Sequence, residues 1–290
     1  MNDFSLSRRI GRSGPSEFPL VGSTLTWMKN PTAFALQLYE QYGPIVDVNI
    51  CFRKVVYLLG VEANESVLID GNRSFSNQHG WFLLSRLFAG GLMLQDFDEH
   101  RVSRQIVQRR AFTRNNVESY LFSLRTTVET QVNEWNTTSH FACYKELKSL
   151  MLKVAISIFL GVQEKDECSR LNEELTCILK SALAIPQWQI PGLPFWRGMK
   201  SREFIQKYLA SQIENRRNSV GTDLFTQLCI DCNTQEVMLS REAIVDQMIF
   251  LIMAAHDTTA SLLSSLTMKL AEHQEWQNLV RAELGELRND

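Results

Sequence analysis

Residues 240–271 read SREAIVDQMIFLIMAAHDTTASLLSSLTMKLA, and this stretch decides the fold. Ser240 followed by charged residues and helix formers is typical of a helix start, and no Gly or Pro interrupts the sequence after it. The stretch therefore predicts one helix from Arg241 to Ala271, about 45 Å long at about 1.5 Å per residue. Because this is roughly two to three times the mean helix length, we expect the helix to cross the whole domain.

The centre of this predicted helix is polar although most of its sides are apolar. An apolar helix is typically buried, so the presence of the polar residues Asp257, Thr258 and Thr259 at its centre requires an explanation. A helical threonine can donate to the carbonyl oxygen four residues earlier, and Ala254 and Ala255 leave room one turn before Thr258. Two interpretations are open: a hollowed site that holds a carboxylate, a hydroxyl and water, or a polar cluster that satisfies itself or pairs with another helix.

Two segments of this region carry a family resemblance. Residues 254–259, AAHDTT, resemble the A/G-G-x-D/E-T-T signature of the haem-thiolate monooxygenases (cytochrome P-450), with Ala255 where glycine is usual. Residues 270–277, LAEHQEWQ, resemble the family's L-A-x-H-P-E-x-Q segment, with Gln274 where proline is usual. The resemblance implies a mainly α, cytochrome P-450-like helical fold with a small N-terminal β-hairpin.

Composition excludes several other classes of protein. Hydrophobic residues make up 44% of the 290 residues and charged residues 21%, with a net charge of −2, so nothing suggests nucleic acid or an anionic membrane as a partner. Residues 1–14 contain no apolar core, and the longest clean apolar run is about eight residues against the roughly 20 of a membrane span. We therefore expect a soluble, cytoplasmic chain without a transmembrane anchor. Of six cysteines only Cys229 and Cys232 form a C-x-x-C pair, and ordinary reduced thiols are expected.

The first part of the chain predicts a small helix and strand region. Pro31 at a first helical position and Gly43 after a last turn bound a helix. Residues 44–50 and 54–59 are short, β-branched and apolar, which predicts a hairpin, and residues 61–69 predict a short helix. This order, with its Tyr-Gly-Pro-Ile-Val segment, also resembles the opening of the family.

The rest of the chain has an almost entirely helical pattern after residue 98. No linker or repeat separates domains, so we expect a single, incomplete domain over residues 1–290, with a small helix and strand part at 31–76 and a helical part at 98–290. The predicted helices that precede the long one begin at Asp98 and then cover 116–135, 144–160, 166–183, 197–219 and a short segment from Asp223.

Two loop-like segments carry large apolar residues. Residues 74–95 include Trp81 and Phe82, and such a composition is typical of a loop over an apolar cavity or of a buried loop without a ligand. In the family this region covers the substrate pocket, so the resemblance implies that Trp81 and Phe82 bind substrate together with Phe250 and Met253. The proline-rich connector 185–195 is either a lid over the pocket or a packed loop.

The resemblance also implies a haem site. His100 and Arg104 lie four residues apart and share a helix face, where the family places donors that hold the haem propionates. By themselves the two would be a solvated helix face. Ala254 and Ala255 would lie against the haem. Thr258 would donate a hydrogen bond to oxygen bound at the iron, and Asp257 would connect Thr258 to a proton path.

Two later motifs of the family are not in these 290 residues: E-x-x-R after the long helix, and F-x-x-G-x-x-x-C-x-G with the axial cysteine. The last cysteine is Cys232, before the long helix. The resemblance thus covers the first two thirds of the family, truncated after the long helix and the start of the next, and we expect this chain alone to be catalytically silent.

The function implied by the resemblance is a haem-dependent monooxygenase that inserts one oxygen atom from O2 into an apolar organic substrate. Its electrons would come from a ferredoxin or a flavoprotein reductase. Two alternatives are open. One is a truncated or split product without catalysis, and the other is an all-α protein that binds hydrophobic ligands and no haem.

Overall fold

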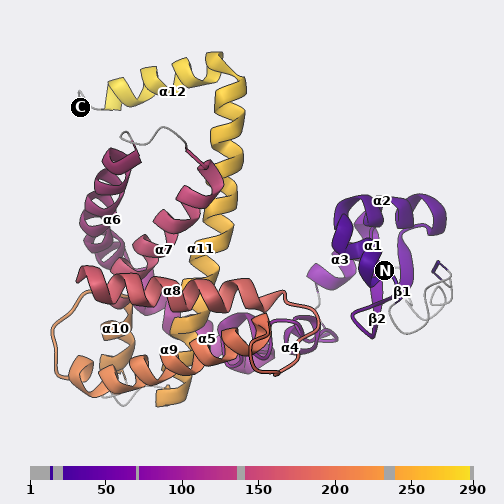
Figure 1. Ribbon diagram of the computed structural model, residues 1–290, viewed down its shortest axis with the longest axis horizontal. Coiled ribbons are helices and arrows are strands. Elements are labelled where there is room, and N and C mark those ends of the chain that lie inside the picture. Colours follow the sequence, from indigo (N-terminus) through magenta and orange to yellow (C-terminus); the bar gives the residue numbers. More distant parts are fainter. Residues whose placement is uncertain (1–13, 16–21, 70–71, 136–140, 232–238, 288–290) are drawn as a thin grey trace. The chain divides into compact units, whose positions relative to one another are not determined.

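The computed structural model describes residues 14–15, 22–69, 72–135, 141–231 and 239–287 (Figure 1). The chain divides into two compact units, residues 1–76 and 77–290. The first holds the only strands of the described residues and the second is helical. The prediction of a mainly α fold with a small N-terminal hairpin is confirmed.

The first unit follows the order expected from its sequence. The hairpin pairs antiparallel, with Ile45 opposite Leu58 and Ile50 opposite Arg53. Its two-residue turn places Cys51 and Phe52 at φ 52° and 64°, a conformation that is unusual for residues with large side chains. The elements are α1 (Thr24–Lys29), α2 (Pro31–Tyr42), β1 (Ile45–Ile50), β2 (Arg53–Leu58) and α3 (Val61–Leu68).

Local signals set the ends of α2. The side chain of Asn30 accepts a hydrogen bond from the Ala33 amide at 2.9 Å, and Pro31 occupies the first turn. At the other end Gly43 adopts φ 90°, which glycine accepts without the strain of a side chain. The apolar face of α2 and the inward side of the hairpin then form one small core of Phe34, Leu38, Val46, Val48 and Ile50.

The helical unit is built around α11 (Arg241–Glu272), which runs through it lengthwise in Figure 1. The predicted start is confirmed, because the Ser240 side chain accepts a hydrogen bond from the Ala243 amide at 3.1 Å. The helix packs on α7, α9, α10, α12 and η2. The other elements are α4 (Asn77–Gly80), η2 (Leu92–Leu94), α5 (Phe97–Ala111), α6 (Arg114–Trp135), α7 (Cys143–Leu160), α8 (Lys165–Ala182), α9 (Pro194–Arg217), α10 (Leu224–Asp231) and α12 (Gln274–Leu287).

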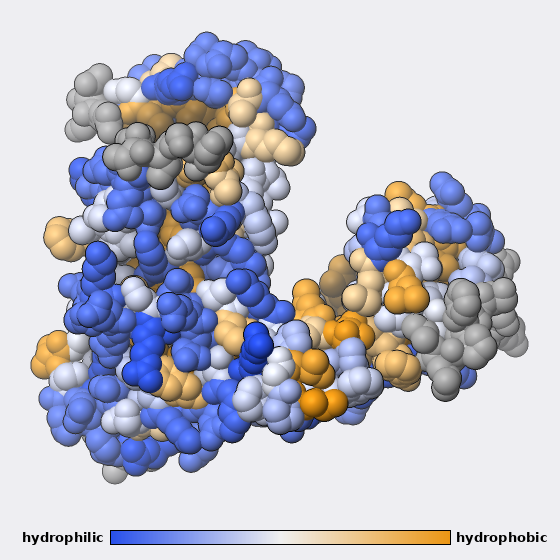
Figure 2. All heavy atoms as spheres, in the orientation of Figure 1, coloured by the Kyte–Doolittle hydropathy of each residue, from blue (hydrophilic) through white to orange (hydrophobic). Residues whose placement is uncertain are grey.

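Only the N-terminal half of α11 is buried, which corrects the expectation of a helix enclosed on most sides. Residues 247–252 are buried throughout; in Figure 1 α9 crosses this half of α11 and α10 lies beside it. Beyond Ala260 no large apolar residue of α11 is fully buried, and Leu262 at 67%, Leu266 at 50% and Met268 at 52% are exposed. Exposed apolar residues continue along α12, and apolar surface is visible beneath this helix in Figure 2. The apolar pattern of the sequence is therefore a buried core helix in one half and an uncovered face in the other.

Among the described helices, α11 alone has the length and apolar composition that could cross a membrane. The core helix of a globular unit has the same properties, so this finding is weak evidence for a membrane span.

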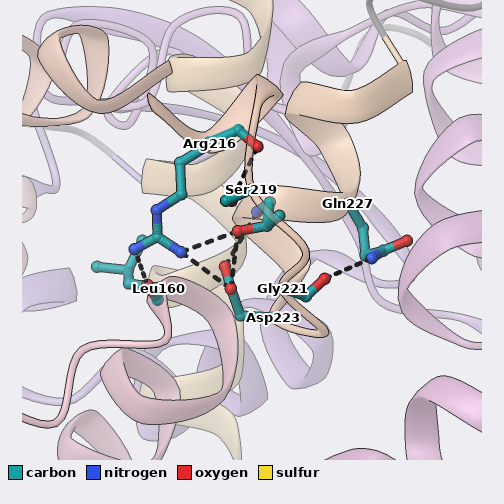
Figure 3. A network of polar contacts seen from close by, with 7 residues as sticks. Leu160, Arg216, Ser219, Gly221, Asp223 and Gln227 are labelled. Atoms are coloured by element: carbon teal, nitrogen blue, oxygen red, sulfur yellow. Dashed lines mark hydrogen bonds and ion pairs between the residues drawn. The ribbon is translucent and has the colours of Figure 1, made fainter. Parts of the chain in front are cut away.

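A charged network joins the ends of three helices of this unit (Figure 3). The Arg216 guanidinium on α9 pairs with Asp223 at 2.9 Å and donates to the carbonyl oxygen of Leu160, at the end of α7, at 2.6 Å. Asp223 in turn caps α10 by accepting a hydrogen bond from the Thr226 amide at 3.0 Å. All three helix ends are thereby fixed to one partly buried cation.

A second polar cluster ties the loop before η2 to α11. Gln247 is fully buried, and its side chain accepts from the Leu92 amide at 3.1 Å and donates to the Gly90 carbonyl oxygen at 3.2 Å. Beside it, Arg202 pairs with Asp246 at 2.7 Å, and its Nε donates to the carbonyl oxygen of Leu87 at 2.8 Å. These bonds satisfy the loop backbone where it crosses the core.

At Gly90 the backbone of the loop lies close to the side chain of Asp246. This glycine adopts φ 79°, and a Cβ atom there would lie 2.5 Å from Oδ2 of Asp246. We expect Gly90→Ala to lower the free energy of unfolding by at least about 2 kcal/mol, because both the backbone strain and the displaced Asp246 oppose folding. Urea unfolding followed by circular dichroism measures this.

Gly285→Ala is the matched control, because no heavy atom lies within 4 Å of a Cβ added at this α12 position. Alanine in a helix interior is expected to be neutral or to add up to about 1 kcal/mol. Equal stability of Gly90→Ala and the parent chain would show that the loop is not held against Asp246.

Candidate functional site

The polar centre of α11 opens on one side of the helix. Oγ1 of Thr258 donates to the carbonyl oxygen of Ala254 at 2.8 Å, which confirms the bond expected for a helical threonine. Ala254 and Ala255 are half-buried, whereas Thr258 and Leu262 are exposed. Since residues four apart share a helix face, Ala254, Thr258 and Leu262 form one stripe. Its smallest side chain is that of Ala254, and the side chains of Thr258 and Leu262 are exposed to solvent. We call these three residues the open stripe.

Asp257 is held by a residue that sequence reasoning missed. Its Oδ1 lies 2.6 Å from Nζ of Lys148 on α7, and the two side chains are 44% and 32% exposed. Burial lowers the pKa of Lys148, but the ion pair with Asp257 outweighs it and raises this pKa above its usual value. The carboxylate thus pairs with another helix, as one of the two open interpretations required, and keeps part of its surface in contact with solvent.

His256 lies beside this pair on the buried side of α11 and is 4% exposed. Its Nδ1 is 3.3 Å from Oδ1 of Asp257 in a geometry that makes no hydrogen bond. Burial lowers the pKa of His256 from its ordinary value of 6.5, with an opposing effect from Asp257 and a further lowering from Lys148. The imidazole is therefore mainly neutral at pH 7.

The predicted donor pair on α5 consists of His100 and Arg104. His100 is half-buried and Arg104 is exposed. Within the described part of the chain neither side chain makes a hydrogen bond or an ion pair, whereas the neighbouring Arg101 pairs with Asp98 at 3.2 Å. Helices α5 and α11 both contact η2.

These features fit one face of a haem. A flat apolar macrocycle with two carboxylates needs cationic donors and a helix face without bulky residues. His100 and Arg104 would supply the first, and Ala254 and Ala255 would supply the second. The axial ligand does not fit, since Cys229 is buried in the core and none of the described cysteines lies in the family's cysteine motif. Cys232 lies outside the described residues, and within them no group of three or more His, Cys, Asp or Glu could hold a metal ion.

The predicted substrate-binding residues are in different environments. Phe250 is 7% exposed and packs in the core against Gly91, and Met253 is half-buried at the core edge. Trp81 is 48% exposed and Phe82 is half-buried. The structure therefore places Phe250 and Met253 on α11 near the polar centre, and Trp81 and Phe82 on the loop that leads to Gly91.

The connector 185–195 lies against that loop. Nε2 of Gln187 donates to the carbonyl oxygen of Leu83 at 2.7 Å, and Nη1 of Arg86 donates to the carbonyl oxygen of Gln187 at 3.0 Å. The Arg86 guanidinium also lies 4.8 Å from the ring centroid of the fully buried Phe195. The two apolar segments that the sequence singled out are thus bonded to each other.

The comparisons with known proteins agree on one family. A family model described as Cytochrome P450 matches residues 13–290. The chain is 31% identical over 276 residues to "Putative cytochrome P450 136" of Mycobacterium tuberculosis, which covers 93% of this chain and 56% of that protein. It is 26% identical over 279 residues to "Cytochrome P450 26B1" of Xenopus tropicalis, with 93% and 54% covered.

The solved structure "Retinoic acid bound cyanobacterial CYP120A1" has the same fold, with a TM-score of 0.82 at 23% identity over 95% of this chain and 64% of that one. The chain spans just over half the length of the curated relatives cited above.

Burial of His256 predicts a pH dependence of stability. Because its folded pKa lies below 6.5, the unfolded chain binds more protons as the pH falls through 6.5. Stability that is present above this pH is therefore lost as the pH falls toward the folded pKa, at up to about 1.4 kcal/mol per pH unit. Urea unfolding between about pH 7.5 and about pH 5.5 measures this slope.

His256→Gln keeps a side-chain donor and removes the titration. We expect this variant to lose less stability on acidification than the parent chain, while every other group titrates as before. Identical slopes for the two proteins would mean that His256 takes up its proton equally in the folded and unfolded states.

Proposed function

Because the chain belongs to the cytochrome P450 family, we propose that its residues form the oxygen-activating face and the substrate pocket of a haem-dependent monooxygenase. The family implies a haem iron cofactor and insertion of one oxygen atom from O2. The observation that carries the proposal is the pairing, on one uninterrupted helix, of the open stripe at Thr258 with the solvent-linked carboxylate of Asp257.

When bound, haem supplies the iron at which O2 is activated and reduced. On α5, His100 and Arg104 would hold its carboxylates, because both have unused donors and an arginine suits a carboxylate. On α11, Ala254 and Ala255 would let the macrocycle approach the helix axis.

Proton delivery is the task of three side chains in this proposal. Thr258 holds a proton at Oγ1, which it now donates to Ala254 and which rotation about the Cβ–Oγ1 bond would redirect away from the helix backbone. Asp257 exchanges protons with solvent through its exposed part, and Lys148 fixes the position of its carboxylate. A relay of single groups moves protons without filling the site with water.

The substrate class proposed is an apolar organic molecule. Phe250 and Met253 would line the pocket from α11, and Trp81 and Phe82 would cover it from the loop, with the connector 185–195 as a lid. The solved relative binds retinoic acid, a largely apolar molecule by its chemistry, which supports this class. We propose a ferredoxin or a flavoprotein reductase as the electron donor, and a cytoplasmic location.

The axial thiolate motif of the family is not part of these 290 residues, so we propose that they do not catalyse the reaction alone. The alternatives remain a non-catalytic split product and an all-α protein for hydrophobic ligands. A protein of the last kind would take up hydrophobic ligands and no haem.

Haem reconstitution of the chain distinguishes these possibilities. We expect one haem per chain, bound without a thiolate, since the distal residues are present and the family's axial motif is not. The reduced carbon monoxide complex should therefore lack the red-shifted Soret band of thiolate-ligated haem. A thiolate-type band would contradict the proposed inactivity, and failure to bind haem at all would favour the hydrophobic-ligand alternative.

The role of Thr258 is tested in a haem-loaded enzyme that combines these residues with an axial cysteine. Thr258→Ala removes the proton donor, so electrons should be consumed with about tenfold less product while substrate binding is kept. Product formed per electron pair is the measurement. Thr258→Ser keeps a hydroxyl and should retain most coupling, and equal coupling in the alanine and serine variants would refute the role of the hydroxyl.

A further inference from the structure

A cavity of about 370 Å³ lies between α7, α8 and α11, and three lysines are among its lining residues. Lys145, Lys148 and Lys180 line it, and none of its lining residues is acidic. Lys148 has Asp257 as a counter-ion, whereas Lys145 and Lys180 form no ion pair within the described residues. The cavity therefore carries an excess of positive charge, which attracts anions.

Two buried polar atoms of the lining residues have no hydrogen-bond partner. They are Oδ1 of Asn172 on α8 and Nδ1 of His256 on α11, and the His256 residue as a whole is 4% exposed. Leaving such an atom unsatisfied costs about 1–3 kcal/mol. Because both residues line the cavity, a hydroxyl group of a bound molecule would satisfy one of these atoms once its side chain turns toward the cavity.

The remaining wall is apolar. Leu152 is fully buried and Leu179 is half-buried, whereas Lys145 and Lys180 are exposed. The charges thus lie at the mouth and the apolar wall lies deeper. An inorganic anion would use only the mouth, and a hydrocarbon would leave the lysines and the orphaned polar atoms unused.

We propose that this cavity binds a small organic anion with a flat apolar body and a hydroxyl group. The carboxylate lies between Lys145 and Lys180, the body contacts Leu152 and Leu179, and the hydroxyl donates to Oδ1 of Asn172. This site is separate from the open stripe of α11, and the proposal does not depend on haem.

The test uses 6-hydroxy-2-naphthoate, which carries these three features, and isothermal titration calorimetry with the 290-residue chain. We expect saturable binding of one molecule per chain. The uncharged 6-hydroxy-2-naphthamide should bind at least about tenfold more weakly, because charge-assisted hydrogen bonds are among the stronger ones. Equal affinity for the acid and the amide would overturn the proposal, as would no saturable binding up to about 1 mM.

Two variants test the location. The double variant Lys145→Gln, Lys180→Gln changes two exposed side chains and should weaken binding at least about tenfold. Asn172→Leu keeps a side chain of similar size but removes the accepting oxygen, so it should also weaken binding. Asn133→Leu, at an exposed site on α6, is the matched control and should bind as the parent chain does.

His100 and Arg104 on α5 form the competing site for an aromatic carboxylate. Arg104→Gln should leave the affinity unchanged if the anion occupies the cavity. Loss of binding in Arg104→Gln, with full binding in the double lysine variant and in Asn172→Leu, would place the anion on α5 and refute the proposed cavity site. Circular dichroism of each variant confirms that the helices are intact.

Discussion

Burial of the N-terminal half of α11 is the constraint on which the helical unit depends. Residues 247–252 are buried in succession, and full burial of one large apolar side chain contributes about 1.5–3 kcal/mol. This half therefore fixes the helix in rotation and along its axis. Because the helix continues without a break to Glu272, the same fixation places Asp257 and Thr258 one to two turns beyond the core, where the surface begins. The polar centre is positioned by the apolar residues that precede it.

Polar groups inside the core then attach the loop to this helix. Apolar burial alone is non-directional and would leave the backbone of the glycine-rich loop without defined partners. Gln247 supplies one donor and one acceptor to that backbone, and Asp246 holds Arg202, which bonds the loop from the other side. The tight fit of Gly90 against Asp246 and of Gly91 against Phe250 shows why two glycines occur there. The loop that carries Trp81 and Phe82 is thus fixed at one end.

Much of the fold could be predicted from the sequence because its signals are local. Ser240, Asn30 and Gly43 set helix ends within one turn of themselves, and the apolar pattern of residues 241–271 gave the length of α11. The exposure of Leu262 and the role of Lys148 could not be predicted in this way. Both depend on which helix packs beside α11, and a lysine on an amphipathic helix has the same local pattern whether it faces solvent or a distant carboxylate. The bond of Thr258 to Ala254 was predictable, because its partner lies four residues away on the same helix.

Two ion pairs on α11 differ in a way that suits different tasks. Arg202 and Asp246 are 12% and 19% exposed, and removing one partner of so buried a pair costs about 3–5 kcal/mol, so this pair anchors the structure. Lys148 and Asp257 are 32% and 44% exposed, and solvent screening reduces the net worth of such a pair to about 1 kcal/mol or less. A contact this weak opens and closes readily by thermal motion. A rigid anchor in the core and a labile carboxylate at its edge, three turns further along one helix, together combine a fixed position with a mobile acidic side chain, which is what the proposed proton relay to Thr258 requires.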